Sequence, residues 1–268
     1  MSNLSLTLDT PDLARLYEQI SVDRQFVAGK TLVEKLELTP GDRVLDIGCG
    51  TGLLAEHLAD SVGPRGFVLG LDPLPHRIEI AHLRSRPNLK FQVGNAYDLG
   101  GFPGSDFNAI VLNAVFHWLP EKLAPLKQFH RLLKRRGRLG ISTGDKDNVH
   151  ALQRAKARVL ARDPYARFPE SKDGIAHHVT LGQLEELLTA AGFTWFRVER
   201  VARANLHADA EAAIRFSEAS SFGNFLGHLP TELHAQARAE IAAELEQSRT
   251  PEGIRQDGAR LQAIAFKI

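Results

Sequence analysis

The chain has 268 residues, enough for one large α/β domain with insertions, and its net charge is +1. This charge creates no field that would attract nucleic acid or an anionic membrane, and no apolar run approaches the length that spans a bilayer. The single cysteine, Cys49, excludes an internal disulfide, and the first residues lack the basic and apolar regions of a signal peptide. We therefore expect a cytoplasmic protein, monomeric or homodimeric, that binds neither nucleic acid nor membranes.

Two helices are expected before the first strand, over residues 10–37, because apolar residues recur there at helical spacing. Thr10 or Asp12 can cap the first helix, and Pro11 suits its first turn. The sequence Thr-Pro-Gly-Asp at 39–42 ends the helical pattern.

The segment 43–52, with the sequence RVLDIGCGTG, begins as an apolar strand and ends in glycines at every second position. A helical pattern starts directly after it, so the order of strand, glycine-rich turn and helix predicts the first unit of a doubly wound α/β domain. Glycines can adopt positive φ, and they let a ligand lie against the backbone. We therefore expect a ligand at the carboxyl end of this strand.

The dinucleotide fingerprint G-x-G-x-x-G would require a glycine at position 53, which is Leu53. Asp46 precedes the turn, and its carboxylate suits a cationic ligand better than a pyrophosphate. The segment resembles the first motif of the class I S-adenosylmethionine-dependent methyltransferases. The resemblance implies that Asp46 orders water or binds the amino group of the cofactor's methionine end. It also implies that the turn with Gly48, Cys49 and Gly50 passes beneath the cofactor.

In the resembled family, an N-terminal helical segment lies over cofactor and substrate. The resemblance makes Tyr17 and Gln25 candidates for contacts to the methionine end of the cofactor. The residues alone equally allow Tyr17 to pack in the core and Gln25 to face solvent.

Residues 66–72 predict the second strand, which ends in Asp72. An acid at this place can accept hydrogen bonds from both ribose hydroxyls of an adenosine, and the resemblance assigns this role to Asp72. The alternative is that Asp72 caps the next helix. Leu74 would supply an apolar wall to the adenine.

Residues 88–94 predict the third strand, which Asn95 and Ala96 follow. Many members of the resembled family carry Asp-Ala here, and the acid accepts a hydrogen bond from the exocyclic amine of adenine. The carbonyl of Asn95 can accept the same hydrogen bond more weakly than a carboxylate. The backbone near Ala96 would meet a ring nitrogen.

A fourth strand is expected to end at Asn113, and the segment that leaves it should cross the centre of the sheet, where the transferred methyl would lie. Methyltransferases that act on amino groups of nucleic-acid bases carry two prolines here, whereas this chain has Ala114 and Val115. His117 is the candidate general base because it is the ionisable imidazole of the segment. It can equally hold a backbone group or pack beside the cofactor. We count both Asn113 and His117 among the expected cofactor contacts.

An amphipathic helix is expected over 121–135, with Gly137 as its left-handed cap. The remaining strands are expected at 138–143, 193–198 and 261–267. Helical insertions are expected over 145–179 and 208–256, where they would cap the carboxyl edge of the sheet.

Two pairs of side chains in these insertions bear on function. His177 and His178 are adjacent and point in different directions in a helix or a strand, so we expect no metal site. Phe222 and Phe225 can line an apolar substrate pocket or pack in the core.

The sequence thus predicts one methyltransferase domain over residues 1–268, with lid helices at 10–37 and a cofactor-binding core at 40–144. The expected fold is α/β, a doubly wound Rossmann-like sheet of seven strands with an antiparallel last strand and helical cap insertions. The expected reaction is methyl transfer from S-adenosyl-L-methionine, which becomes S-adenosyl-L-homocysteine, to an O, N or C nucleophile of a small molecule in biosynthetic or secondary metabolism. The alternatives are a methyltransferase for proteins or other macromolecules and a nicotinamide-dinucleotide oxidoreductase.

Overall fold

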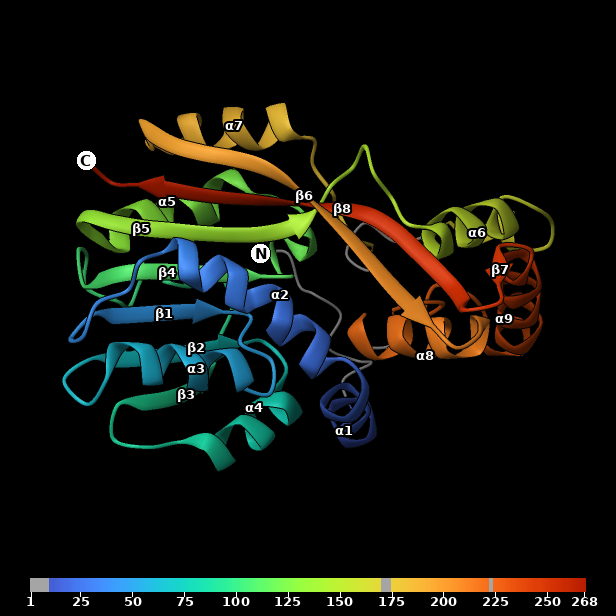
Figure 1. Ribbon diagram of the computed structural model, residues 1–268, viewed down its shortest axis with the longest axis horizontal. Coiled ribbons are helices and arrows are strands. Elements are labelled where there is room, and N and C mark those ends of the chain that lie inside the picture. Colours follow the sequence, from blue (N-terminus) through green and yellow to red (C-terminus); the bar gives the residue numbers. More distant parts are fainter. Residues whose placement is uncertain (1–9, 170–174, 222–223) are drawn as a thin grey trace.

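A mostly parallel sheet forms the body of the protein, and helices cover both of its faces (Figure 1). The computed structural model describes residues 10–169, 175–221 and 224–268. In spatial order the strands are β3-β2-β1-β4-β5-β8-β6, and β7 pairs with β8. Their bounds are β1 Arg43–Ile47, β2 Phe67–Asp72, β3 Leu89–Val93, β4 Phe107–Asn113, β5 Leu133–Gly144, β6 Trp195–His207, β7 Arg249–Thr250 and β8 Gly253–Phe266.

Strand β8 runs antiparallel to both β5 and β6, while β1 to β5 pair in parallel. The predicted Rossmann-like α/β sheet with an antiparallel last strand is therefore confirmed. The described residues form an eight-stranded sheet rather than the seven strands expected, because the two-residue strand β7 pairs with the start of β8.

Strand β1 lies between β2 and β4. The chain places β2 and β3 on one side of β1, and then β4 and β5 on the other side. In a doubly wound sheet, such a reversal leaves a crevice outside the carboxyl ends of the strands. The register aligns Asp46 of β1 with Gly70 of β2 and with Val111 of β4. The glycine turn after β1 therefore lies at this crevice.

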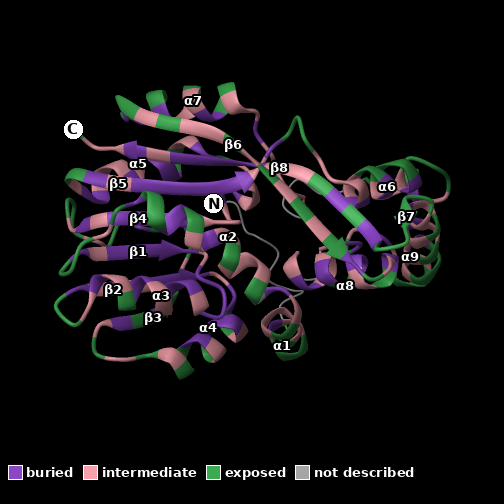
Figure 2. Ribbon diagram, in the orientation of Figure 1, coloured by how far each residue is buried: buried purple, intermediate pink, exposed green. Residues whose placement is uncertain are grey.

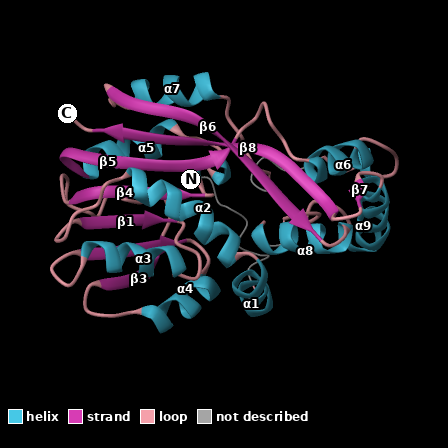
Figure 3. Cartoon of the chain, viewed as in Figure 1, coloured by secondary structure: helices cyan, strands magenta, loops and turns pink. Residues whose placement is uncertain are grey.

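The helices divide between the two faces of the sheet and the cap (Figure 3). The α-helices are α1 Pro11–Ile20, α2 Val22–Lys35, α3 Leu53–Val62, α4 Pro75–Ala81, α5 Leu123–Leu132, α6 Ala151–Leu160, α7 Leu181–Ala190, α8 Ala210–Ser220 and α9 Thr231–Glu246, and the short 3₁₀ turns are η2 His82–Arg84, η3 Phe116–Trp118 and η4 Tyr165–Arg167. None of the described helices is both long and apolar enough to cross a membrane.

Two apolar cores lie on opposite faces of the sheet. Val44 packs with α2, α3 and α4, whereas its neighbour Leu45 packs with α5 and α7. Successive side chains of a strand point to opposite faces, so one strand can serve both cores. Figure 2 shows that β1 and β5 are largely buried, as expected for strands that are covered on both sides.

Strands β6 and β8 continue beyond the sheet as a two-stranded ribbon that carries the cap (Figure 1). Residues 201–207 of β6 pair with residues 254–260 of β8. The expected strands at 193–198 and 261–267 were therefore too short, and residues 249–256 are largely strand rather than a helical insertion. In this ribbon, β6 mostly alternates between exposed and half-buried side chains, so it lacks the continuous apolar run of a strand inside the sheet.

Helix α5 ends earlier than predicted, and β5 begins directly after it at Leu133. Leu133 is fully buried and pairs with Phe107 of β4, so tertiary packing ends the helix. Gly137 was the wrong residue for the left-handed position, which Arg136 occupies with φ 63°. The N–H of Arg136 donates to the carbonyl of Lys267 at 2.6 Å, which fixes this turn against the end of β8.

Candidate functional site

The glycine turn after β1 closes over the ends of two strands. The N–H groups of Gly48 and Cys49 donate to the carbonyl of Leu71 in β2, at 2.6 and 3.0 Å. Gly48 and Gly50 have φ values of 70° and 57°, which side chains rarely adopt. A Cβ on Gly48 would also overlap Val115, and one on Gly50 would lie 3.2 Å from the ring of Tyr17. Glycine is therefore required here for backbone conformation and for space.

Asp46 is the penultimate residue of β1 and Asp72 the last residue of the neighbouring strand β2, and both are buried. The carboxylate of Asp72 accepts hydrogen bonds from the N–H groups of Gly50 at 2.9 Å and Leu74 at 3.0 Å. The Oδ2 atom of Asp46 is buried and has no hydrogen-bond partner among the described residues. Burial, together with the nearby charge of Asp72, raises the pKa of Asp46 to about 8.

The unsatisfied oxygen of Asp46 indicates which chemical groups the crevice can bind. A buried acceptor without a partner costs free energy, and a cationic donor would satisfy it best. A pyrophosphate beside two buried acids would instead be repelled. The residues therefore fit a cofactor with a positively charged amino group, as S-adenosylmethionine has.

Two adjoining cavities, of about 150 and 30 Å³, lie around the glycine turn. Among the predicted cofactor residues, those that line the larger one are Tyr17, Gln25, Gly48, Asp72, Leu74, Asn95, Ala96 and Asn113. Those that line the smaller one are Tyr17, Gln25, Asp46, Gly48, Cys49 and Asn113. Gly50 lines neither of these cavities, and its N–H donates to Asp72. The structure thus brings these predicted residues together at one crevice.

Asn95 uses its side chain differently from the prediction. Its Oδ1 atom accepts hydrogen bonds from the N–H groups of Tyr97 at 2.8 Å and Asp98 at 3.1 Å. The carbonyl that the sequence assigned to adenine therefore organises the turn after β3. Ala96 in this turn is buried and lines the larger of the two cavities.

Gln25 and Asn113 are held by a residue that the sequence did not single out, Arg260 of β8. Arg260 donates to Oε1 of Gln25 at 2.8 Å, to Oδ1 of Asn113 at 3.3 Å and to Oγ of Ser142 at 3.2 Å. The side-chain amide of Asn113 also donates to the carbonyl of Gln25 at 2.8 Å. This network fixes helix α2 to the end of β4.

Tyr17 of α1 closes the crevice from the other side. The guanidinium carbon of Arg77 lies 3.9 Å from the centre of its ring, close enough for a cation–π contact. Burial raises the pKa of the Tyr17 hydroxyl. The ring therefore stays neutral over the glycine turn at physiological pH.

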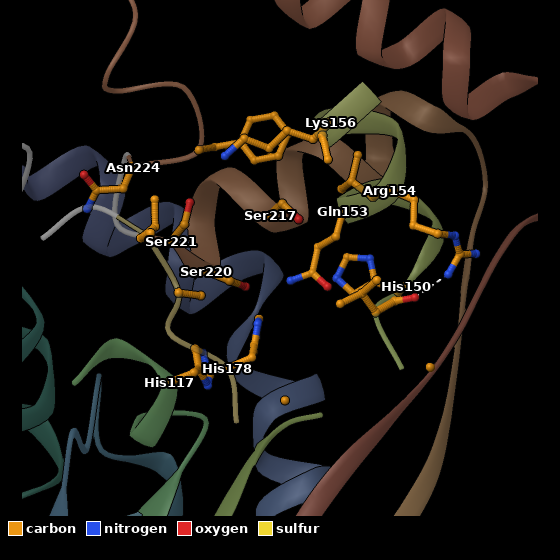
Figure 4. A pocket seen from close by; sticks show the side chains of 18 of the residues that line it. His117, His150, Gln153, Arg154, Lys156, His178, Ser217, Ser220, Ser221 and Asn224 are labelled. Atoms are coloured by element: carbon orange, nitrogen blue, oxygen red, sulfur yellow. Dashed lines mark hydrogen bonds between the residues drawn. The ribbon is translucent and has the colours of Figure 1, made fainter. Parts of the chain in front are cut away.

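A third cavity, of about 740 Å³, lies between the edge of the sheet and the cap. It shares Gln25, Ala114, Trp118 and Ser220 with the cavity of about 150 Å³. Figure 4 shows His117 and His178 close together at one end, and Lys156 and Arg154 at the other. Its volume suits a small organic molecule.

Apolar side chains from the cap form much of the wall of this cavity. They include Leu152, Leu160, Tyr165, Phe168, Phe216 and Phe225. Phe225 lines this cavity and also belongs to the buried apolar cluster of the cap, so it meets both expected alternatives, whereas Phe222 lies outside the described residues. No group of three or more His, Cys, Asp or Glu side chains in the described part of the chain is arranged to hold a metal ion.

His117 lines the large cavity and is not among the residues that line the two smaller ones. The structure therefore does not bring it together with the predicted cofactor residues. Its Nδ1 atom lies 3.2 Å from Oγ1 of Thr143, and its ring centre lies 5.3 Å from that of His178. Burial, followed by the neighbouring His178, lowers the pKa of His117 well below its usual value. The imidazole is therefore neutral at pH 7.

Comparisons with known proteins bear on this arrangement. A family model described as a methyltransferase domain matches residues 18–197. Aklanonic acid methyltransferase DauC from Streptomyces sp. (strain C5) is 31% identical over 131 residues, which cover 47% of this chain and 59% of DauC. The match therefore spans less than two thirds of that relative.

Two further comparisons cover more of the chain. Trans-aconitate 2-methyltransferase from Methylobacterium nodulans is 27% identical over 224 residues, or 82% of this chain and 84% of that protein. The crystal structure of the YcgJ protein from Bacillus subtilis has a TM-score of 0.61 at 16% identity, over 90% of this chain and 97% of that one. At this identity the structural likeness shows the fold alone.

Proposed function

Because the chain belongs to the class I S-adenosylmethionine-dependent methyltransferases, we propose that it transfers a methyl group from S-adenosyl-L-methionine to an O, N or C nucleophile of a small molecule. One observation carries the proposal: the unsatisfied Oδ2 atom of Asp46 lies beside a glycine turn at the crevice of the sheet. The cavity of about 740 Å³ beside this crevice has a volume that suits a small-molecule acceptor.

The lining of the two small cavities supports the following placement of the cofactor. Asp46 would accept a hydrogen bond from the amino group, and Asp72 from the ribose hydroxyls. The adenine would lie against the buried Leu74 and the turn at Asn95 and Ala96. The methionine end would lie among residues that line the smaller cavity, which are Tyr17, Gln25, Gly48, Cys49 and Asn113.

The bound cofactor supplies a methyl group that its sulfonium already activates. The remaining task of the protein is to orient the acceptor and to exclude water. Trp118 and Ala114 border both the crevice and the large cavity, so they mark the place where acceptor and cofactor meet. The neutral imidazole of His117 lies on the acceptor side, where it can take up a proton from the nucleophile.

Binding of S-adenosylhomocysteine at pH 7 should release most of one proton. With a pKa of about 8, Asp46 is mainly protonated in the free protein at pH 7, and a bound ammonium lowers that pKa below 7. Calorimetry in two buffers of different ionisation enthalpy measures the release. Asp46→Asn should bind more weakly and show no buffer dependence, whereas the exposed Asp98→Asn should behave as wild type. A buffer-independent heat in the wild type would contradict this role.

His117→Ala should leave the affinity for S-adenosylhomocysteine within about twofold, because His117 borders the acceptor cavity only. Asn113→Ala, which removes the side-chain hydrogen bonds to Gln25 and Arg260, should weaken the same affinity about tenfold. With an acceptor present, His117→Ala should lower kcat about 100-fold if it takes the proton. Loss of cofactor affinity in His117→Ala would move His117 to the cofactor site.

Thermal-shift measurements with two cofactors test the proposed function. S-adenosylhomocysteine at about 100 times its Kd should stabilise the protein by about 2.7 kcal/mol, whereas NAD⁺ should not stabilise it. Stabilisation by NAD⁺ alone would replace the methyltransferase with an oxidoreductase.

A further inference from the structure

Two arginines face the large cavity from the ribbon of β6 and β8. Arg203 of β6 pairs with Gly258 of β8, and Arg260 lies two residues further along β8. Residues two apart on a strand point to the same face, so Arg203 and Arg260 are diagonal neighbours on one side of the ribbon. Both line the cavity of about 740 Å³, together with Gly258, and neither lines the two smaller cavities.

Neither arginine forms an ion pair within the described part of the chain. Arg260 is 7% exposed, and its hydrogen-bond partners among the described residues are the neutral side chains of Gln25, Asn113 and Ser142. Arg203 is half-buried and reaches Asn205 at 3.4 Å. Most buried cations in proteins are paired with an acid, because desolvation of an unpaired charge is costly.

The described lining of the cavity offers no free acid to neutralise the arginines. Asp145 is the carboxylate among these residues, and Arg200, Asn148 and the N–H of Asp147 already bind it. Burial and the charge of Arg203 lower the pKa of Arg260 to about 9, and burial also lowers the pKa of Arg203. The charge of Arg24 also lowers the pKa of Arg203, so both guanidinium groups lie near another cation, and neither has a counter-ion among the described residues.

We infer that Arg203 and Arg260 bind a carboxylate on the methyl acceptor, whose apolar body fills the cap side of the cavity. This inference rests on the proposed function, because it takes the large cavity as the acceptor site. A guanidinium binds a carboxylate through two parallel hydrogen bonds, and a diagonal pair of arginines offers such donors from two strands. The aromatic and aliphatic side chains from α6, η4 and α8 suit a hydrophobic body. The substrate class is therefore an acidic small molecule with an apolar frame.

The test compares 2-naphthoate with its neutral analogue 2-naphthamide by calorimetry, on protein saturated with S-adenosylhomocysteine. The acid should bind at least about tenfold more tightly than the amide, because charge-assisted hydrogen bonds are the stronger ones. Arg203→Gln and Arg260→Gln should each reduce this preference to about twofold or less. Arg203→Lys should retain part of it, since it keeps the charge and loses the fork of donors.

Matched controls lie on the same two strands. Arg197→Gln on β6 and Arg255→Gln on β8 replace side chains that are 80% and 60% exposed and lie outside the lining of the cavity, so both should keep the preference. Arg203→Gln should not lower the Tm of the free protein, because it removes a cation without a counter-ion. A lower Tm with an unchanged preference for the acid would assign Arg203 a structural role and overturn the inference.

The remaining outcomes separate this inference from the proposed function. Equal binding of acid and amide, or no binding of the acid up to about 10 mM, would overturn the inference while leaving the cofactor site intact. A loss of S-adenosylhomocysteine affinity in both glutamine variants, with an unchanged preference for the acid, would assign the arginines to the cofactor's carboxylate instead. Wild-type protein that fails to bind S-adenosylhomocysteine would refute the proposed function, and the acid would then be compared with the amide on the free protein.

Discussion

Gly50→Val should lower the affinity for S-adenosylhomocysteine by at least about 100-fold, or about 2.7 kcal/mol. Gly50 has φ 57°, where a side chain costs about 1–2 kcal/mol and a β-branched one more. Its Cβ would lie 3.2 Å from the ring of Tyr17, so the valine methyls would push Tyr17 from the crevice or enter the space beneath the cofactor. The N–H that Asp72 binds would also shift. Calorimetry with S-adenosylhomocysteine measures the loss.

The control for backbone strain is Gly41→Val. Gly41 also has positive φ, 97°, but no atom lies within 4 Å of a Cβ placed there. This variant should lose stability from strain and keep its affinity for S-adenosylhomocysteine. If Gly50→Val were to bind as tightly as Gly41→Val, the turn would not lie under the cofactor.

Asp72→Ala should lower the affinity for S-adenosylhomocysteine by at least about tenfold, or about 1.4 kcal/mol. The carboxylate has two tasks in our account: it holds the N–H groups of Gly50 and Leu74, and it accepts hydrogen bonds from the ribose. The alanine variant leaves two buried donors without a partner, so the Tm should fall as well. Asp72→Asn keeps one oxygen acceptor and should show a smaller loss.

The exposed Asp98, which follows the next strand, provides the matched control for Asp72. Asp98→Ala removes a carboxylate near the same turn without removing a buried hydrogen bond, so affinity and Tm should stay at wild-type values. Calorimetry and thermal unfolding of the three variants separate the two tasks of Asp72. An unchanged affinity in Asp72→Ala would remove the ribose contact from the account.

The part of the site that the sequence predicted is the part that local structure dictates. Asp46 and the glycines belong to one turn, and Asp72 ends the next strand of the same βαβ unit. Because parallel neighbours end at the same edge of a sheet, their side chains meet wherever the sheet forms. The short distance along the chain therefore made the crevice predictable.

The large cavity depends on contacts that are remote in sequence. Arg260 lies 235 residues from Gln25, and Arg203 meets it through the pairing of β6 with β8. On β6, Arg197 and Arg200 are exposed and Arg203 is half-buried, a pattern that is also typical of a solvated strand face. His178 likewise joins His117 only through the loop before α7, so the sequence offered no signal for that contact.

A crystal structure of the protein with S-adenosylhomocysteine is the most direct test of where this ligand binds. We expect the ligand to lie over the turn Gly48–Gly50, with its amino group at Oδ2 of Asp46 and its ribose at the carboxylate of Asp72. Its sulfur should face the large cavity past Trp118. A ligand bound elsewhere, or an empty crevice at saturating ligand, would contradict the central claim.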